Sequence, residues 1–432
     1  MEYARALETI ANLTKFGINL GLSRITKLLA LLGNPHEAVP VVHIGGTNGK
    51  GSTTAILAAV LKEAGYKVGA YTSPHLISYT ERYMINGNPI AEEEFARLVS
   101  EVVPLSEQVY TSTGEYPTEF EVLTALAFLY FYREKVDILL LEVGMGGDID
   151  STNVVSSPLL SIITNVTLDH QDYLGPTPRE IAIRKGGIIK KNRPVITAAQ
   201  DEEVLNVLRS IAQEKRAPLW EVFKEVQWEK ISEDEIGQTF RAQTKEQDYG
   251  ELYLSLQGDH QLVNGATALL VLEVLQAQGW NITREKIKKG FAAAAWPGRL
   301  EIMGHDPLVV IDGAHNAAGM EALSRWLRNK RPHHPKIILV IGMLADKDRL
   351  GAANFLASLV DKVVITKPLS PRAGNWQELA SYFGKEPGDV YIIENLNRAI
   401  NQGLEEARES DLVLITGSLY LIGEARKILL NS

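Results

Sequence analysis

The chain has 432 residues and a formal net charge of −9, with 45% hydrophobic and 22% charged residues. This mix is typical of a globular protein, and the length predicts two or three domains. The sequence contains no cysteine, which excludes disulfides, thiolate metal sites and a cysteine nucleophile.

Neither a membrane nor nucleic acid is expected as a partner. Residues 1–10 carry two acids and lack the apolar core of a signal peptide. The apolar run at 122–132 is about half of the ~20 residues that a membrane-spanning helix needs. The one dense basic run, KKNR at 190–193, is typical of a solvated turn. We therefore expect a cytoplasmic protein.

The first part of the chain alternates apolar runs with helix-periodic segments, which predicts βαβ units and a parallel sheet. The predicted strands are 41–45, 68–72, 138–143 and 159–166. Each is followed by Gly, Ser, Asn or Asp. Because ligands bind at the carboxyl ends of strands in open α/β sheets, we expect the functional residues at that edge.

In the later part of the chain the strand–helix pattern is interrupted, and a second domain is then predicted. Short β-like pieces occupy 217–256, and helices are predicted at 261–278 and 283–294. A Pro-Gly pair in AAAAWPGRLE indicates a boundary, which gives domains at 1–296 and 297–432. After it the strand–helix alternation restarts, which predicts a smaller Rossmann-like α/β domain.

The stretch GGTNGKGS at 45–52 lies between a predicted strand and a predicted helix. This is the context of a phosphate-binding P-loop, in which glycine-permitted turns and a helix N-terminus form an anion nest. An ordinary glycine-rich turn is the alternative. The expected nucleotide-binding residues are Thr47, Asn48, Gly49, Lys50, Gly51 and Ser52.

The loop departs from the general pattern G-x-x-x-x-G-K-[ST], which would need glycine at Ile44 and a hydroxyl at Gly51. A different oxygen must then ligate Mg²⁺, and Ser73, just past a strand end, is the candidate; a local turn cap is its alternative. Glu142 ends an apolar run, where an unpaired carboxylate is costly. Mg²⁺ is a natural partner for it, and a buried salt bridge is the alternative.

Eight ordered motifs resemble those of a known family, the folylpolyglutamate synthase/dihydrofolate synthase branch of the Mur-type ligases. They are GTNGKGS at 46–52, YTSPHLISYTER at 71–82, TEFE at 118–121, LEVGMGGDIDSTN at 141–153, LDHQDYLG at 168–175, RKGGIIK at 184–190, WPGRLE at 296–301 and DGAHN at 312–316. The resemblance spans nearly the whole chain. It implies an N-terminal P-loop domain with a parallel sheet and a smaller C-terminal α/β domain.

The resemblance also implies a set of metal ligands. His170, which by itself would more often be structural, joins Ser73 and Glu142. Lys185, which its place on a helix alone predicts to be solvated, matches a lysine that is carbamylated in the family and serves a second Mg²⁺. Carbamylation requires a neutral amine, and a nearby cation lowers the pKa of a lysine.

Three positions near Lys185 depart from the family pattern. Arg184 and Gly186 stand where the family has glutamate and alanine, and Asp148 stands where it commonly has arginine. The first exchange leaves the charge environment of Lys185 open. The second would leave any anion bound by that arginine to another cation.

A pterin site is implied by the same resemblance, with Phe120 as a plate for ring stacking or, alternatively, a core residue. Its implied residues are Asn19, Leu20, Thr118, Phe120, Asp150, Ser151 and Thr152.

In the C-terminal half, Asn264 is predicted to begin a helix and resembles an adenine-side asparagine, with a simple helix cap as the alternative. Arg299, Asp312 and Ser418 are expected to contact the nucleotide, and His315 to lie near the chemistry. Asp312 and His315 could instead only bond each other.

The implied activity is an ATP-dependent ligase that adds L-glutamate to dihydropteroate, reduced folates or both, through an acyl phosphate. Lys50, Lys185, Asp312 and His315 are the expected catalytic residues, the last two as proton acceptors. ATP and two Mg²⁺ ions are the expected cofactors, a monovalent cation is left open, and a monomer is expected. The alternatives are a related Mur-type ligase for another carboxylate, or a P-loop ATPase or nucleotide-binding module.

Overall fold

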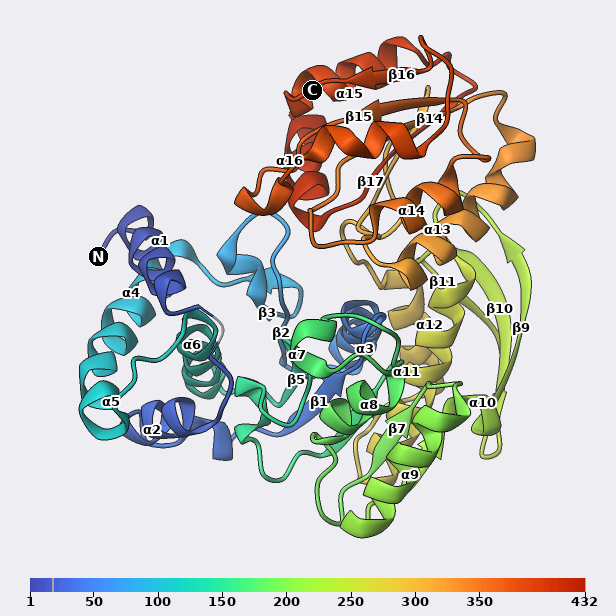
Figure 1. Cartoon of the computed structure of the whole chain (residues 1–432). Coiled ribbons are helices and arrows are strands. Elements are labelled where there is room, and N and C mark those ends of the chain that lie inside the picture. Colours follow the sequence, from blue (N-terminus) through green and yellow to red (C-terminus); the bar gives the residue numbers. More distant parts are fainter. Residues whose placement is uncertain (18, 432) are drawn as a thin grey trace. The chain divides into compact units, whose positions relative to one another are not determined.

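The computed structural model of the chain describes residues 1–17 and 19–431 (Figure 1). The chain divides into two compact units. The first unit comprises residues 1–231, 239–254 and 262–294, and the second comprises 232–238, 255–261 and 295–432. The main part of the second unit thus begins at Ala295, near the Pro-Gly pair. Two short segments of the earlier chain also belong to it, which the sequence did not indicate.

The first unit is built on an eight-stranded sheet. Its strands are β1 (Val41–Gly45), β2 (Val68–Tyr71), β3 (Tyr83–Ile85), β4 (Asn88–Pro89), β5 (Ile138–Glu142), β6 (Leu160–Ile163), β7 (Val195–Thr197) and β8 (Leu219–Glu221). Their order is β4-β3-β2-β5-β1-β6-β7-β8. The strands from β2 to β8 in this order run parallel, and β3 and β4 are antiparallel at one edge.

The central strands read as continuous apolar runs because they are covered on both faces. Every residue of β1 and of β5 is buried. The helices of this part of the chain are α1 (Tyr3–Ala11), α2 (Ser23–Leu31), α3 (Lys50–Glu63), α4 (Glu92–Val102), α5 (Ser106–Thr113), α6 (Glu119–Arg133), α7 (Gln171–Leu174), α8 (Pro178–Gly186), α9 (Glu202–Lys215), α10 (Val222–Glu225), α11 (Asp259–Ala277) and α12 (Arg284–Ala293).

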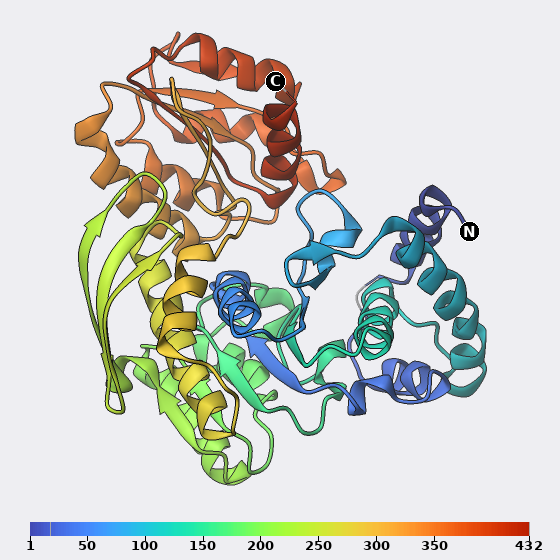
Figure 2. The same cartoon turned by 180° about the vertical axis from the view of Figure 1, so that it is seen from behind.

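Two hydrophobic clusters attach these helices to the sheet. Helices α1, α2, α4 and α6 pack with Val41, Leu139 and Leu141, and α8 and α9 pack with Ile163 and Val195. On another side, α12 lies against α3, which is visible in Figure 2 as a yellow helix beside a blue one. The approach is close because α12 carries Gly290, where a Cβ would lie 2.4 Å from the Cα of Val60.

A separate three-stranded sheet contains β9 (Val226–Glu233), β10 (Gln238–Thr244) and β11 (Asp248–Leu254), in the order β11-β10-β9. Burial alternates along β10, as expected when one face is packed and the other is solvated. The β-like texture predicted for 217–256 is therefore present, although residues 222–225 form a short helix, α10.

The second unit is a smaller α/β layer structure. Its strands are β12 (Glu301–Gly304), β13 (Leu308–Asp312), β14 (Ile337–Ile341), β15 (Lys362–Ile365), β16 (Val390–Ile392) and β17 (Leu412–Thr416), and its helices are α13 (Ala317–Lys330), α14 (Arg349–Leu356), α15 (Leu396–Glu405) and α16 (Leu419–Leu430). The strand order is β12-β13-β17-β14-β15-β16. All neighbours are parallel except β12. The predicted α/β class with two parallel sheets is confirmed.

The register of the first sheet brings the candidate residues to one edge. Ile44 of β1 pairs with Glu142 of β5, and Tyr71 of β2 pairs with Leu141 of β5. Gly45 of β1 pairs with Ile163 of β6. The four strands β2, β5, β1 and β6 therefore end side by side, as a ligand site of this fold class requires. Within residues 1–17 and 19–431, none of the helices has both the length and the apolar character needed to cross a membrane.

Candidate active site

The loop between β1 and α3 is braced by the segment that follows β6. The N–H groups of Thr47 and Asn48 donate to the backbone carbonyl (2.9 Å) and the side-chain oxygen (2.8 Å) of Asn165. The hydroxyl of Thr164 donates to the carbonyl of Asn48 at 2.7 Å. Gly46 has φ +137°, and a Cβ there would lie 1.9 Å from Oγ1 of Thr164. These contacts hold the loop in a single backbone conformation, which requires a glycine at position 46.

Helix α3 begins at Lys50, directly after Gly49 in a left-handed conformation with φ +87°. The first turn of a helix leaves N–H groups without intrahelical partners, and together with the helix dipole these favour a bound anion. This turn contains Gly51 and the buried Ser52. The geometry around the loop thus fits a phosphate group.

Asn264 lies beside this loop but not at a helix start. Helix α11 begins at Asp259, after Gly258 with φ +92°, so the prediction that Asn264 begins or caps the helix is wrong. The left-handed turn at Gly258 places the helix start earlier than the side-chain pattern suggested. Instead, the buried Asn264 side chain packs on Gly49, where a Cβ would lie 2.4 Å from its Oδ1.

Two lysines and a carboxylate surround the carbonyl groups of the loop. Lys50 Nζ lies 3.8 Å from Oε1 of Glu142 and donates to the carbonyls of Gly46 (3.3 Å) and Thr47 (3.2 Å). Lys185 Nζ donates to the same Gly46 carbonyl at 2.9 Å. The salt-bridge interpretation of Glu142 therefore has a partner, Lys50, in this structure.

Lys185 is buried, with 5% of its surface exposed, so the solvated position expected from a helix alone is wrong. Burial, and secondly the positive charge of Lys50, lower the pKa of Lys185 to about 7. An appreciable share of the amine is therefore neutral near neutral pH, which is the form that reacts with carbon dioxide.

The donor set at this edge fits a magnesium ion that is held partly by substrate. In the described part of the chain, no group of three or more His, Asp or Glu side chains is placed to hold a metal. Mg²⁺ is commonly bound by one or two carboxylates together with substrate phosphates rather than by a cage of protein ligands. The buried carboxylate of Glu142 next to the phosphate loop is consistent with that mode.

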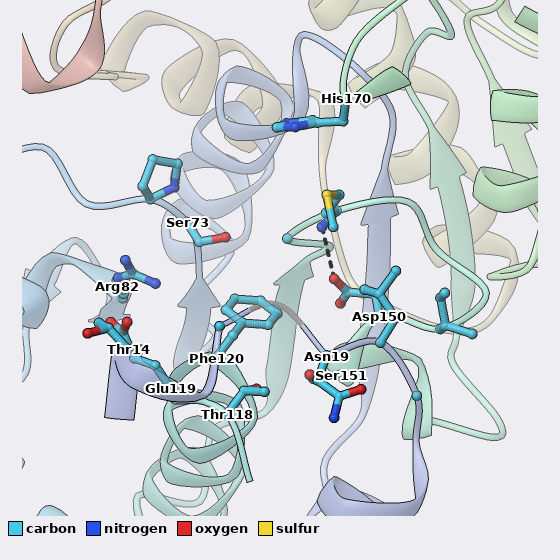
Figure 3. Close-up of a pocket in the computed structure, with 17 residues that line it drawn as sticks. Thr14, Asn19, Ser73, Arg82, Thr118, Glu119, Phe120, Asp150, Ser151 and His170 are labelled. Atoms are coloured by element: carbon cyan, nitrogen blue, oxygen red, sulfur yellow. Dashed lines mark hydrogen bonds between the residues drawn. The ribbon is translucent and has the colours of Figure 1, made fainter. Parts of the chain in front are cut away.

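Next to this edge, the first unit contains a cavity of about 470 Å³ (Figure 3). This volume is within the range of about 300–1,000 Å³ typical of small-molecule sites. The predicted residues that line it are Asn19, Leu20, Ser73, Thr118, Phe120, Asp150, Ser151 and His170. Lining residues that the sequence reasoning did not select include Thr14, Arg82, Glu119, Gly144, Met145 and Ile149. All of these except Thr14 lie inside the quoted motifs and could have been found there.

Phe120 is both a wall of the cavity and a packing residue. Its ring lies against the backbone of Gly144, where a Cβ would come within 2.4 Å of Cζ. It also packs on the hydrophobic cluster of α6. The stacking and core interpretations of Phe120 are therefore compatible, because one side of the ring faces the cavity (Figure 3).

The carboxylate of Asp150 is held by groups behind the cavity wall. It accepts hydrogen bonds from the N–H of Met145 (2.9 Å) and from the N–H and hydroxyl of Thr152 (2.9 and 2.5 Å). Burial raises the pKa of Asp150 above its usual value. Thr152 is fully buried and does not line the cavity. Thr152 was predicted to contact the substrate, but in the structure it lies behind Asp150 and supports its carboxylate.

A histidine completes this arrangement. His43 Nε2 lies 2.8 Å from Oγ1 of Thr152. Since the single hydroxyl proton of Thr152 goes to the carboxylate of Asp150, Nε2 of His43 must be the donor in this contact. Burial lowers the pKa of His43 to about 3, so the ring is neutral and acts as a fixed donor.

Two of the departures from the family pattern contact each other. Arg184 Nη1 lies 2.8 Å from Oδ2 of Asp148, and the N–H of Asp148 donates to the carbonyl of Arg184 at 2.8 Å. Against the pattern that the resemblance implies, arginine at 148 and glutamate at 184, the two charges are exchanged between the positions. The pair ties the loop after β5 to the end of α8, next to Lys185.

In the second unit, Asp312 ends β13 and is buried. Its carboxylate accepts from the N–H groups of Leu300 (3.0 Å) and Ala314 (2.9 Å). Burial raises the pKa of Asp312, and the charge of Arg299 acts in the opposite direction.

His315 and Ser418 are oriented by backbone groups. His315 Nδ1 lies 2.8 Å from the carbonyl of Gly313. A carbonyl only accepts, so Nδ1 carries a proton in this contact. Ser418 is 2% exposed, and its hydroxyl caps α16 by accepting from the N–H of Tyr420 at 3.2 Å. This gives Ser418 a structural role that the sequence did not suggest.

Two Mur ligase family models match most of the chain. Residues 44–272 match the Mur ligase middle domain, and residues 298–419 match the Mur ligase, glutamate ligase domain. Over 427 residues the chain is 38% identical to dihydrofolate synthase/folylpolyglutamate synthase of Bacillus subtilis, covering 98% of each protein.

Solved structures show the same relationship. Folylpolyglutamate synthase of Mycobacterium tuberculosis complexed with ADP superposes with a TM-score of 0.90 at 32% identity, over 99% of each chain. Escherichia coli FolC in complex with DHPP and ADP superposes with a TM-score of 0.86 at 31% identity, over 100% of this chain and 98% of that one. The chain therefore belongs to the folylpolyglutamate synthase/dihydrofolate synthase family of Mur ligases.

Proposed function

We propose that the protein is an ATP-dependent ligase that joins L-glutamate to the carboxylate of dihydropteroate, of reduced folates, or of both. The observation that carries this proposal is a phosphate-binding loop, with Lys50 beside Glu142, next to a cavity of about 470 Å³ in the same unit. Family membership and the complexes of relatives with ADP and with DHPP support it.

The cavity suits a flat heteroaromatic ring with hydrogen-bonding edges. Phe120 offers a ring face, and Asp150 offers a carboxylate whose orientation is fixed by Thr152. We propose that the ring stacks on Phe120 and donates to Asp150. Its carboxylate arm then extends toward the nucleotide loop.

In the first step, a carboxylate oxygen of the acid attacks the γ-phosphorus of ATP, the bond to the β-phosphate oxygen breaks, and ADP leaves. Lys50 and the N–H groups at the start of α3 stabilise the charge on the phosphate oxygens, since phosphoryl transfer depends on positioning and electrostatics. Bound Mg²⁺ would supply further charge neutralisation. Glu142, Ser73 and His170 are the proposed protein ligands for two ions, with Lys185 if it is carbamylated.

In the second step, the amine of glutamate attacks the carbonyl carbon of the acyl phosphate, and phosphate leaves. The amine must lose a proton to form the amide. We propose that His315, whose ring is oriented by the contact of Nδ1 with the carbonyl of Gly313, or Asp312 accepts it. The buried Asp312 and Arg299 are proposed nucleotide contacts of the second unit.

The carbamylation of Lys185 is proposed from the resemblance and supported by its burial and its pKa of about 7. Carbon-13-labelled bicarbonate should give a carbamate signal by nuclear magnetic resonance in the wild-type protein that is absent from Lys185→Met. Equal spectra for the two proteins would remove this part of the proposal.

The test of the function is coupled product analysis. The purified protein is incubated with MgATP, L-glutamate and either dihydropteroate or tetrahydrofolate, and ADP and the glutamylated product are quantified. One ADP per amide bond is expected, and comparison of the two acids decides between the synthase activities. Absence of both ADP and product with every pterin would contradict the proposal.

A further inference from the structure

A buried arginine contacts a residue that forms part of the wall of the cavity described above, without lining the cavity itself. Arg24, in the first turn of α2, has only 2% of its surface exposed and does not line the cavity. A buried guanidinium requires partners for its fork of donors. The partners of Arg24 belong to three segments of the chain, two of which reach the cavity.

The three guanidinium nitrogens of Arg24 donate to three different residues. Nε donates to Oε2 of Glu121 at 3.0 Å, Nη1 donates to Oε2 of Glu115, and Nη2 donates to the carbonyl of Asn19 at 2.5 Å. The Asn19 side chain is held as well, because its Nδ2 donates to Oε2 of Glu115 at 3.2 Å. Both the backbone and the side chain of Asn19 are thus tied to the Arg24 cluster.

The partner Glu121 belongs to α6, whose start forms another part of the cavity wall. Its Oε2 accepts from the N–H (2.7 Å) and the hydroxyl (3.0 Å) of Thr118, and so closes the capping box that begins α6. Thr118 and Phe120 line the cavity (Figure 3). The same carboxylate oxygen that sets this helix start also receives Arg24.

We propose that Arg24 is a positioning residue for the pterin cavity, which fixes the distance between the wall at Asn19 and the wall at Thr118 and Phe120. Its rigid, planar fork is suited to this because it binds both walls at once, whereas a lysine carries a single ammonium. The inference rests on the proposed function, since it takes the pterin acid as the ligand of the cavity.

A purely structural role makes a different prediction. Removing one partner of a buried ion pair destabilises a protein because the other charge is left unpaired, whereas replacing both partners avoids that cost. The double variant Arg24→Met with Glu121→Gln leaves no buried charge. Glutamine can still close the capping box with Thr118. The double variant loses the links of Arg24 to the Asn19 carbonyl, to position 121 and to Glu115, whose side chain is 52% exposed and stays solvated.

The first measurement compares Arg24→Lys with Arg209→Lys. Arg209 makes a similar fork to Glu221 at 2.7 and 2.8 Å and also reaches Glu202, but its partners do not line the cavity. We expect the KM for dihydropteroate or tetrahydrofolate to rise about tenfold in Arg24→Lys, below the roughly hundredfold cost of a 1 Å misplacement. The KM for ATP should stay at the wild-type value. Arg209→Lys should leave both constants unchanged.

The decisive measurement uses the double variant, with its melting temperature and both KM values. A raised pterin KM with wild-type stability and an unchanged ATP KM is expected. A pterin KM at the wild-type value in either Arg24 variant would overturn the inference, whatever the stability. Failure of the proposed function is a separate result, because then the wild-type protein itself would show no pterin-dependent ADP release.

Discussion

The nucleotide loop and the pterin cavity of the first unit are kept in shape by different means. The loop depends on backbone geometry, with positive φ at Gly46 and Gly49 and with amides and carbonyls paired to residues 164–165. The cavity depends on side chains that never reach it, namely Arg24 behind Asn19 and Thr152 behind Asp150. Changes in the loop should therefore abolish phosphate chemistry, whereas changes behind the cavity should weaken only pterin binding.

The largest effect is expected at the loop lysine. Lys50→Ala removes the ammonium next to Glu142, and ligase activity should fall by about 10²–10³-fold, as for other deletions of a group that stabilises transition-state charge. The fall in activity is measured as the rate of ADP release. The matched control is Lys62→Ala, an exposed lysine in the last turn of the same helix. Equal activity of the two variants would exclude Lys50 from the chemistry.

Gly46→Ala should break the loop by shape alone. The new Cβ would lie 1.9 Å from Oγ1 of Thr164, so the loop must move, and a shift of about 1 Å can cost roughly 10²-fold in rate.

Gly65→Ala is the control for Gly46→Ala, since Gly65 also has positive φ (+95°) but nothing within 4 Å of the added Cβ. It should lose only about 1–2 kcal/mol of the free energy of unfolding, the usual cost of a left-handed residue, and keep its activity. If both glycine variants lose activity equally, the close approach at Thr164 is not what the loop requires.

Thr152→Val should separate the cavity from the loop. The change keeps the volume but removes the hydroxyl that donates to Asp150, and a hydrogen bond to a charged group contributes about 1.5–3 kcal/mol. The pterin KM should rise about tenfold while the ATP KM is unchanged. Thr197→Val, which deletes another buried hydroxyl away from the cavity, should change neither. A parallel rise of both KM values in Thr152→Val would argue against the separation.

The smallest effect is expected at the exchanged ion pair. Asp148 and Arg184 are partly exposed, with 29% and 43% of their side-chain surfaces accessible, and such pairs contribute about 1 kcal/mol or less. Asp148→Arg and Arg184→Glu should each lower kcat/KM a few-fold. The double variant should recover most of the loss, because the pair is then restored with its charges reversed. No recovery would mean that the two side chains act independently.

Motif-sized features could be predicted from the sequence, because their chemistry lies in consecutive residues. The parallel strands, the glycine loop and the strand ends at Ser73 and Glu142 all follow from local patterns, and the structure contains them. The lining of the cavity by Asn19, Leu20 and Phe120 was reached through the resemblance rather than from spacing.

Contacts between distant segments could not be predicted. Arg24 meets Glu121 across 97 positions, and His43 meets Thr152 across 109; no local pattern links such residues. Burial of Lys185 was missed because the sequence of a helix does not show which of its faces packs against the rest of the protein. The helix predicted at 261–278 is present as α11, but Asn264 does not begin it, because the helix already starts at Asp259 after a left-handed turn at Gly258.

The central claim is that the pterin acid is phosphorylated by the nucleotide in the loop before it meets glutamate. The most direct measurement uses dihydropteroate or tetrahydrofolate, whichever the enzyme accepts, with its reacting carboxylate labelled with heavy oxygen, and follows the label by mass spectrometry. An acyl phosphate route transfers one labelled oxygen to inorganic phosphate for each amide bond formed. Unlabelled phosphate, or label in AMP, would contradict the account.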